Sequence, residues 1–262
     1  MPKRPSAASA VTPHPLISNE RLQHLYVTLL RARLLRARNR LRKSSSPLVA
    51  REAIVTGTVT HLEEGDSLMP VAGDQLAALA RGHKLRAIVA NRLIAGVLPG
   101  ASTAGARFAI ATGYAMAGQG GKQIVLAFSG PGIQSLDGLH TSMAYAAQQK
   151  LGMVFVIETA GDSDLSSSVH TDAIGICGIP VDGNDVVAIY RVAQEAIQRA
   201  RRGVGPTLID CKPWPLEPAA DPVRRLEQAL ERRGLETRRL KERTLAAFRK
   251  ELQAAQQWRQ AR

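Results

Sequence analysis

A strand, a helix and a second strand follow one another in the middle of the chain. The apolar run QIVLAFS (residues 123–129) leads through GPGIQ into SLDGLHTSMAYAAQQ (residues 135–149), where apolar residues recur at helical spacing. The apolar run LGMVFVIE (residues 151–158) comes next. A helix that joins two strands in this way makes the strands parallel, with a right-handed crossover. The sequence therefore predicts an α/β protein built on a parallel sheet.

The same alternation continues after this unit. The strand IPVDG (residues 179–183) is followed by a helix over residues 185–202 and by the strand PTLIDCK (residues 206–212). Ligands of such folds bind at the carboxyl ends of the strands. We therefore expect one rim of the sheet to bring together the GPG turn, residues 158–162 and residues 182–185.

Four helices are predicted before the first predicted strand. Apolar spacing indicates helices over residues 18–43 and 50–62, the second stopped by the turn EEGD, and a short helix closed by Gly82. Residues 103–118 are almost uncharged and rich in glycine and alanine. Such a segment is expected to be a helix packed closely against another backbone, at a subunit or sheet interface, with Met116 in the core.

The organisation of the chain follows from these elements. With 262 residues and 45% apolar composition, one sizeable α/β domain with a helical appendage is expected. The predicted parts are a disordered basic tail (1–17), the α/β domain with its leading helices (18–213), a proline-rich linker (214–221) and a helical carboxy-terminal extension (222–262).

The net charge of +13 is concentrated at the two ends. Residues 1–43 hold 10 lysines and arginines against one glutamate, and residues 222–262 hold 12 against 5 glutamates. Basic ends can bind nucleic acid or an acidic partner. Arginine stems on amphipathic helices can equally cover a neighbouring surface or face water. Because no aromatic residues are interleaved and no nucleic-acid motif is present, we expect this second role.

Other features bound the cellular setting. No run of about 18 apolar residues is present, and the first residues lack the apolar centre of a signal peptide, so a cytoplasmic protein that does not contact a membrane is expected. Cys177 and Cys211 stand apart without a metal-ligand spacing. This argues against zinc or a disulfide framework, and both are expected to be buried as small apolar residues.

Several segments together resemble the alpha subunit of the thiamine-diphosphate-dependent 2-oxo-acid dehydrogenases of the pyruvate dehydrogenase type. They are LYVTLLRARLL, REAIVTGTVTHLEEGD with ALARG, the FSGPG unit, DPVRRLEQALERRGL and, most distinctively, IPVDGNDVVAIYRVAQEAIQRARRGVGPTLID, within residues 20–258. The resemblance implies a thiamine-diphosphate-binding-like parallel sheet with helices on both faces. It also implies pairing with a beta subunit and oxidative decarboxylation of a 2-oxo acid, for which the alpha subunit holds the diphosphate and magnesium.

The family holds the diphosphate with a Gly-Asp-Gly motif after a strand and an asparagine pair one βαβ unit later. The corresponding positions here are Gly130, Pro131 and Gly132, followed after Glu158 by Thr159 and Ala160. Magnesium is normally bound through a carboxylate and phosphate oxygens. A proline has neither a carboxylate nor an N–H group, so the aspartate and asparagine ligands are missing together.

Other family positions agree with this loss. The family carries a Tyr-Arg pair and histidines before ALARG, where this sequence has Ala72, Gly73, Gln75 and Ala77. The long loop that covers the family's active site is replaced by the short segment PWPLEP. The metal ligands, the phosphate contacts and the covering loop of the family are all replaced in this sequence. Their combined loss indicates that the cofactor site is vacated.

We therefore predict a degenerate dehydrogenase alpha-like subunit with no catalytic residue and no metal ligand. The thiamine diphosphate and magnesium expected for the family would not be bound. The remnants of the cofactor motif are Gly130, Pro131, Gly132, Glu158 and Thr159. The expected partner is a beta-like dehydrogenase subunit or a second copy of the chain, and neither a membrane nor nucleic acid is expected.

Two alternatives remain open from the sequence. The first is an active thiamine enzyme whose metal site is rebuilt from acids near the same rim, namely Asp137, Glu158, Asp162 and Asp164. The simpler interpretation places Asp137 in a first helical turn and the other three at a strand end or in a loop. The second is a basic protein that binds nucleic acid or an acidic partner through its helical ends.

Overall fold

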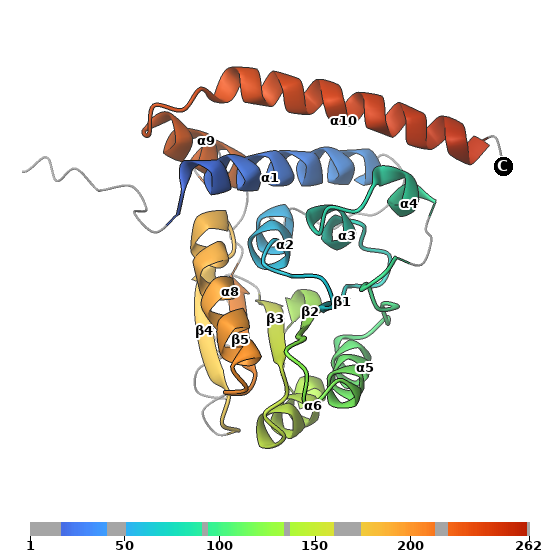
Figure 1. The fold of residues 1–262 in the computed structure, drawn as a ribbon, viewed down its shortest axis with the longest axis vertical. Coiled ribbons are helices and arrows are strands. Elements are labelled where there is room, and N and C mark those ends of the chain that lie inside the picture. The colour runs from blue at the N-terminus through green and yellow to red at the C-terminus, as the bar shows by residue number, and fades with distance from the viewer. Residues whose placement is uncertain are drawn as a thin grey trace, which may run out of the picture.

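A five-stranded sheet forms the centre of the protein. The computed structural model describes residues 17–40, 51–90, 94–133, 137–159, 174–212 and 220–260 (Figure 1). All the strand pairs are parallel, in the order β1-β2-β3-β5-β4. This confirms the predicted fold class. The strands are β1 (Ser67–Met69), β2 (Val125–Ile133), β3 (Met153–Thr159), β4 (Cys177–Asp182) and β5 (Thr207–Lys212).

Helices cover both faces of this sheet (Figure 1). One face packs against α5 and α6, and the other against α2 and α8, with α1 and α3 beyond α2. The helices are α1 (Asn19–Arg40), α2 (Arg51–Val59), α3 (Leu76–Ala80), α4 (Leu85–Val89), α5 (Ala104–Ala117), α6 (Asp137–Gln148), α8 (Val186–Arg201), α9 (Pro222–Glu231) and α10 (Thr237–Gln260). The elements that sequence patterning missed, β1 and α4, are too short to show a period.

The position of β3 at the centre of the sheet explains why its sequence is almost continuously apolar. All seven of its residues are buried. Val154 and Val156 pack into the core beneath α2 and α8, whereas Phe155 and Ile157 pack into the core beneath α5 and α6. A parallel strand covered on both faces has no solvent side, so polar alternation is absent.

Helices α2 and α8 pack closely enough to require a glycine. A Cβ atom on Gly57 would lie 2.6 Å from Cγ2 of Ile189. One turn beyond, the His61 ring lies 4.0 Å from the Tyr190 ring, centroid to centroid, and its Nε2 is 2.7 Å from the Tyr190 carbonyl oxygen. Because a carbonyl can only accept, Nε2 carries the proton and donates it. Burial lowers the pKa of His61 to about 4, against the opposing effect of this hydrogen bond.

The lowered pKa of His61 leads us to predict that the protein is less stable in mild acid. In the unfolded chain His61 takes up a proton below its ordinary pKa of about 6.5, whereas in the folded chain it stays neutral down to about pH 4. The free energy of unfolding therefore decreases as the pH falls from about 6.5 to about 4. We expect the wild type to lose about 2 kcal/mol more than His61→Gln between pH 7 and pH 5, since glutamine keeps the donor but does not titrate. Denaturant unfolding at both pH values measures this, and parallel losses in the two proteins would contradict it.

The terminal helices form a layer outside α2 and α3. Helix α1 packs against α2, α3, α9 and α10, and α10 runs along α1 to reach α4 (Figure 1). At the far end of α10, the Arg86 guanidinium lies 5.0 Å from the centroid of the Trp258 ring. Several basic residues of these helices are paired within the chain, including Arg31 with Glu251 and Lys241 with Glu227. Part of the terminal positive charge therefore stabilises this layer through ion pairs within the chain, whereas the sequence led us to expect arginine stems that cover a partner surface or face water.

Some expectations about single residues were wrong. Cys177 begins β4 at the edge of the sheet and is exposed, whereas Cys211 on β5 is buried as expected. Met116 is 50% exposed because it lies on the outer face of α5, while Met143 and Met153 are in the core. The predicted proline-rich linker lies almost wholly outside the described residues. Within the described ranges, no helix is long and apolar enough to cross a membrane.

Candidate functional site

The rim at the carboxyl ends of β2 and β3 brings together the predicted motif positions. Pro131 pairs in register with Glu158, and Ile133 pairs with Thr159. The register shifts between Phe128 and Pro131 and again after Pro131, so β2 is irregular where the family motif falls. Gly130 has a φ of +86°, a conformation that favours glycine. The sequence therefore placed these positions correctly at one rim.

An arginine that the sequence analysis did not single out occupies this rim. Arg51, the first residue of α2, donates through Nε to both carboxylate oxygens of Glu158, at 3.0 and 2.8 Å. Its Nη1 donates to a carboxylate oxygen of Asp74 at 2.8 Å. The Glu158 side chain is fully buried and that of Asp74 is 6% exposed. We refer to Arg51, Asp74 and Glu158 as the rim triad.

The protonation states of the rim triad follow from its burial and its charges. Burial raises the pKa of the Glu158 carboxyl, and Arg51 counteracts this by favouring the ionised form. Burial also disfavours the charge on Arg51, but Asp74 and Glu158 outweigh it and raise the pKa of the guanidinium. Arg51 is therefore a fixed positive charge, and it is the group that allows a carboxylate to lie in this apolar position.

Thr159 is directed away from the rim triad. Its hydroxyl donates to Oδ1 of Asp210 at 2.7 Å, and both residues are buried. Asp210 lies on β5, on the α5 side of the sheet, because the side chains of neighbouring strand positions alternate between faces. Thr159 stands where the family has an asparagine, and its side chain binds Asp210 of the neighbouring strand β5 instead.

A second arginine fills the space beside Gly130. Arg107 of α5 is buried and donates to the carbonyl oxygens of Ala101, Ser102, Phe128 and Ser129. A Cβ atom on Gly130 would lie 3.2 Å from Nη2 of Arg107 and 3.1 Å from Cγ2 of Val71. The backbone turn of the motif is therefore packed against side chains of the same chain.

The remaining predicted part of the rim, at β4, also has internal partners. Asp182 accepts from Arg225 of α9 at 2.7 Å, and Asp185 accepts from the same guanidinium at 3.4 Å. Asp185 also caps α8 through the amides of Val187 and Ala188. These acids hold α8 and α9 in place.

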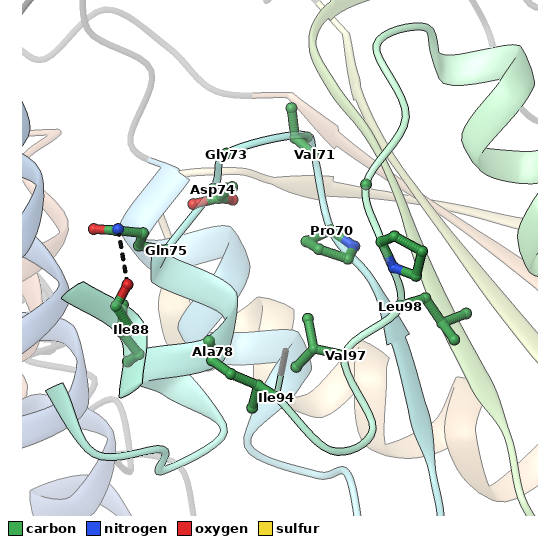
Figure 2. Close-up of a pocket in the computed structure, with 12 residues that line it drawn as sticks. Pro70, Val71, Gly73, Asp74, Gln75, Ala78, Ile88, Ile94, Val97 and Leu98 are labelled. Atoms are coloured by element: carbon green, nitrogen blue, oxygen red, sulfur yellow. Dashed lines mark hydrogen bonds between the residues drawn. The ribbon is translucent and has the colours of Figure 1, made fainter. Parts of the chain in front are cut away.

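A small pocket lies next to the rim triad on its Asp74 side (Figure 2). Its volume is about 260 Å³. Gly73 and Gln75, two positions where the family carries phosphate or substrate contacts, line it, and the Gln75 amide donates to the Ile88 carbonyl oxygen. Most other lining residues are apolar: Pro70, Val71, Ala78, Ile88, Ile94, Val97, Leu98 and Pro99. The described residues that line the pocket offer apolar contacts, and none of them is a lysine, arginine or histidine that could bind a phosphate group.

The described rim does not match the donor set of a magnesium diphosphate site. Magnesium requires oxygen ligands in near-octahedral geometry. Pro131 has no side-chain oxygen, the Thr159 hydroxyl is bound to Asp210, and the Glu158 carboxylate is bound to Arg51. Among the residues that the structure describes, no group of three or more His, Cys, Asp or Glu side chains could hold a metal ion.

The rebuilt metal site that the sequence left open finds no support in the described residues. Glu158, one of its four acids, is committed to Arg51. Asp137 is the first residue of α6, as expected. Asp162 and Asp164 lie outside the described residues. The segment before ALARG has Ala72, Gly73, Gln75 and Ala77 in place of the family's Tyr-Arg pair and histidines, but Arg51 of α2 reaches Asp74 in that segment.

Comparison with known proteins connects this site to a family. Residues 20–218 match the sequence profile of the family described as "Dehydrogenase E1 component". The chain belongs to this family. The E1 family members it resembles include the alpha subunit of an acetoin:2,6-dichlorophenolindophenol oxidoreductase from Bacillus subtilis, 28% identical over 61% of this chain and 57% of that protein. They also include the chloroplastic pyruvate dehydrogenase E1 component subunit alpha-3 of Oryza sativa, 28% identical over 79% of this chain and 60% of that protein.

A shorter match is closer in sequence. The 3-methyl-2-oxobutanoate dehydrogenase subunit alpha of Mycobacterium tuberculosis is 37% identical over 44% of this chain and 35% of its own length. The chain thus spans 57% and 60% of the length of the first two E1 relatives. The predicted resemblance to E1 alpha subunits is confirmed, and the family is one for which thiamine diphosphate and a metal ion are expected.

Proposed function

We propose that this chain is a non-catalytic E1 alpha-like subunit that acts through assembly with a beta-like dehydrogenase subunit. The rim triad carries the proposal. Arg51 pairs with both Glu158 and Asp74, so among the described residues of the rim these carboxylates are not free to serve as oxygen ligands of the family's cofactor. The relatives named above act on acetoin, pyruvate and 3-methyl-2-oxobutanoate, and under this proposal the chain itself turns over none of these.

Assembly is supported by an unusual stretch of surface. Residues 94–121 contain a single charged residue, Arg107, and it is buried. Helix α5 covers the sheet with one face and leaves Ile110, Tyr114 and Met116 exposed around the rest of the helix, at 45%, 50% and 50%. Tyr145 of α6 extends this surface, since its hydroxyl is 3.2 Å from Sδ of Met116. We refer to these four residues as the α5 patch; apolar surface of this kind marks protein interfaces.

The partner is proposed to be a beta-like subunit because the relatives are named as alpha subunits. Their names imply at least one further kind of subunit. The high positive charge of the chain also disfavours a second copy, since two copies would carry like charge.

Co-expression tests this proposal. The chain and the beta-like subunit of the same organism should purify together in equal numbers and elute as one complex in size-exclusion chromatography with light scattering. A chain that remains strictly monomeric beside a soluble beta-like subunit would contradict it. A complex made only of copies of this chain would assign the α5 patch to self-association instead.

A further inference from the structure

We infer that Arg51 is a built-in cation that takes the place of a bound metal ion at this rim and closes the rim to divalent cations. The inference rests on the proposed function, because it gives the physical means by which the cofactor site is lost. It concerns the residues of this chain alone, so it is tested without a partner subunit or an assay of activity.

The first step is that this rim requires a positive charge. Glu158 has a fully buried side chain, and Asp74 is nearly buried beside the same guanidinium. A buried carboxylate without a partner is costly, and the neighbouring Asp74 charge adds to the effect of burial in raising the pKa of Glu158. A fold with these acids needs either a ligand or a side chain to neutralise them.

The second step is that Arg51 supplies this positive charge and joins three separate segments of the chain in doing so. It begins α2, while Glu158 is the last residue but one of β3 and Asp74 precedes α3. Its planar guanidinium donates to both acids at once, which a point charge such as lysine could not match. A bound ion at a subunit's rim would join the same segments only when present, whereas Arg51 joins them always.

The third step is that the arrangement excludes a competing ion. A divalent cation could bind both carboxylates together only by displacing the guanidinium that donates to both of them. Arg51 would then be a buried charge without a partner and would lie next to the ion with like charge. On the other side of Gly130 the space is filled by Arg107 and Val71.

A double-mutant cycle tests the first two steps on the full chain. Arg51→Met should lower the melting temperature by about 10 °C, because it leaves two buried carboxylates without a cation. Arg51→Met with Glu158→Met should recover at least half of that loss, because the main unpaired charge is gone. A double variant as unstable as Arg51→Met would overturn the inference. If Arg51→Met does not fold, a folded double variant supports the inference and an unfolded one overturns it.

Arg107→Met provides the matched control at the same rim. It removes a buried guanidinium of the same size, which hydrogen-bonds to neutral carbonyl oxygens and attracts Glu158 less strongly than Arg51 does. Adding Glu158→Met should therefore recover a much smaller share of its loss of stability than it recovers for Arg51→Met. If Glu158→Met restored the stability of both arginine variants equally, its effect would be general, and the specific pairing of Arg51 with Glu158 would be overturned.

Magnesium chloride alone is the probe for the third step. At about 10 mM it should raise the melting temperature of Arg51→Met and leave the wild type and the double variant unchanged. A stabilised wild type, or an unresponsive Arg51→Met, would overturn the inference. Failure of the proposed assembly would leave these outcomes unaffected, so the two proposals fail separately.

Discussion

Ile110→Asp is expected to weaken assembly with the beta-like subunit by at least about 30-fold, equivalent to about 2 kcal/mol, while the isolated chain stays folded. Ile110 is 45% exposed, so an aspartate at this position is solvated in the free chain. In a complex the carboxylate would be buried against an apolar surface without a partner. Size-exclusion chromatography and titration of the beta-like subunit measure the loss.

Ala247→Asp is the matched control for this variant. Ala247 is an exposed residue of α10, on a helix whose outer surface is charged. Assembly should be unchanged in Ala247→Asp. Equal weakening by both variants would place the effect in the overall charge, and normal assembly of Ile110→Asp would remove the α5 patch from the interface.

Glu52→Ala is expected to destabilise the chain by about 2–4 kcal/mol. The side chain of Glu52 is fully buried and accepts from Arg33 at 2.8 Å and from Arg36 at 2.5 Å. Arg33 also binds Asp221, the residue that caps α9. Loss of Glu52 therefore removes the charge that joins α1 to α2 and weakens the outer helical layer. The free energy of unfolding in denaturant measures this effect.

Glu242→Gln is the control for Glu52. Glu242 pairs with Arg238 four residues away, and both side chains are largely exposed. Such a pair contributes little, so the variant should stay within about 0.5 kcal/mol of the wild type. A small effect of Glu52→Ala would mean that apolar packing alone holds α1 on α2.

The sequence predicted most of the fold because its central elements are long and periodic. The βαβ unit around FSGPG and the amphipathic pattern of α8 each indicate one structure on their own. β1, with the three residues Ser67–Met69, could not be predicted, because its parallel pairing with β2 is what makes it a strand. Short elements of this kind are decided by tertiary contacts.

The candidate site was predicted only where its residues belong to a linear motif. Pro131 and Thr159 were located from the motif, and β2 and β3 do bring them to one rim. The partner of Glu158 was missed because Arg51 lies 107 residues away in sequence. Glu158 was expected to be a polar strand end, yet it is buried, because α2 begins directly above it. A signal available in the sequence was Arg51 at the start of REAIVTGTV, a helix that has no other charged residue except Glu52.

The titration of the chain with thiamine diphosphate and magnesium, alone and in complex with the beta-like subunit, tests most directly whether the cofactor site has been lost. Calorimetry should show no binding heat, and about 1 mM of both ligands should leave the melting temperature unchanged. A dissociation constant near 1 µM would instead stabilise the folded chain by about 4 kcal/mol at that concentration. Binding of that strength would contradict the proposal that the cofactor site is lost and that Arg51 takes the place of the metal ion.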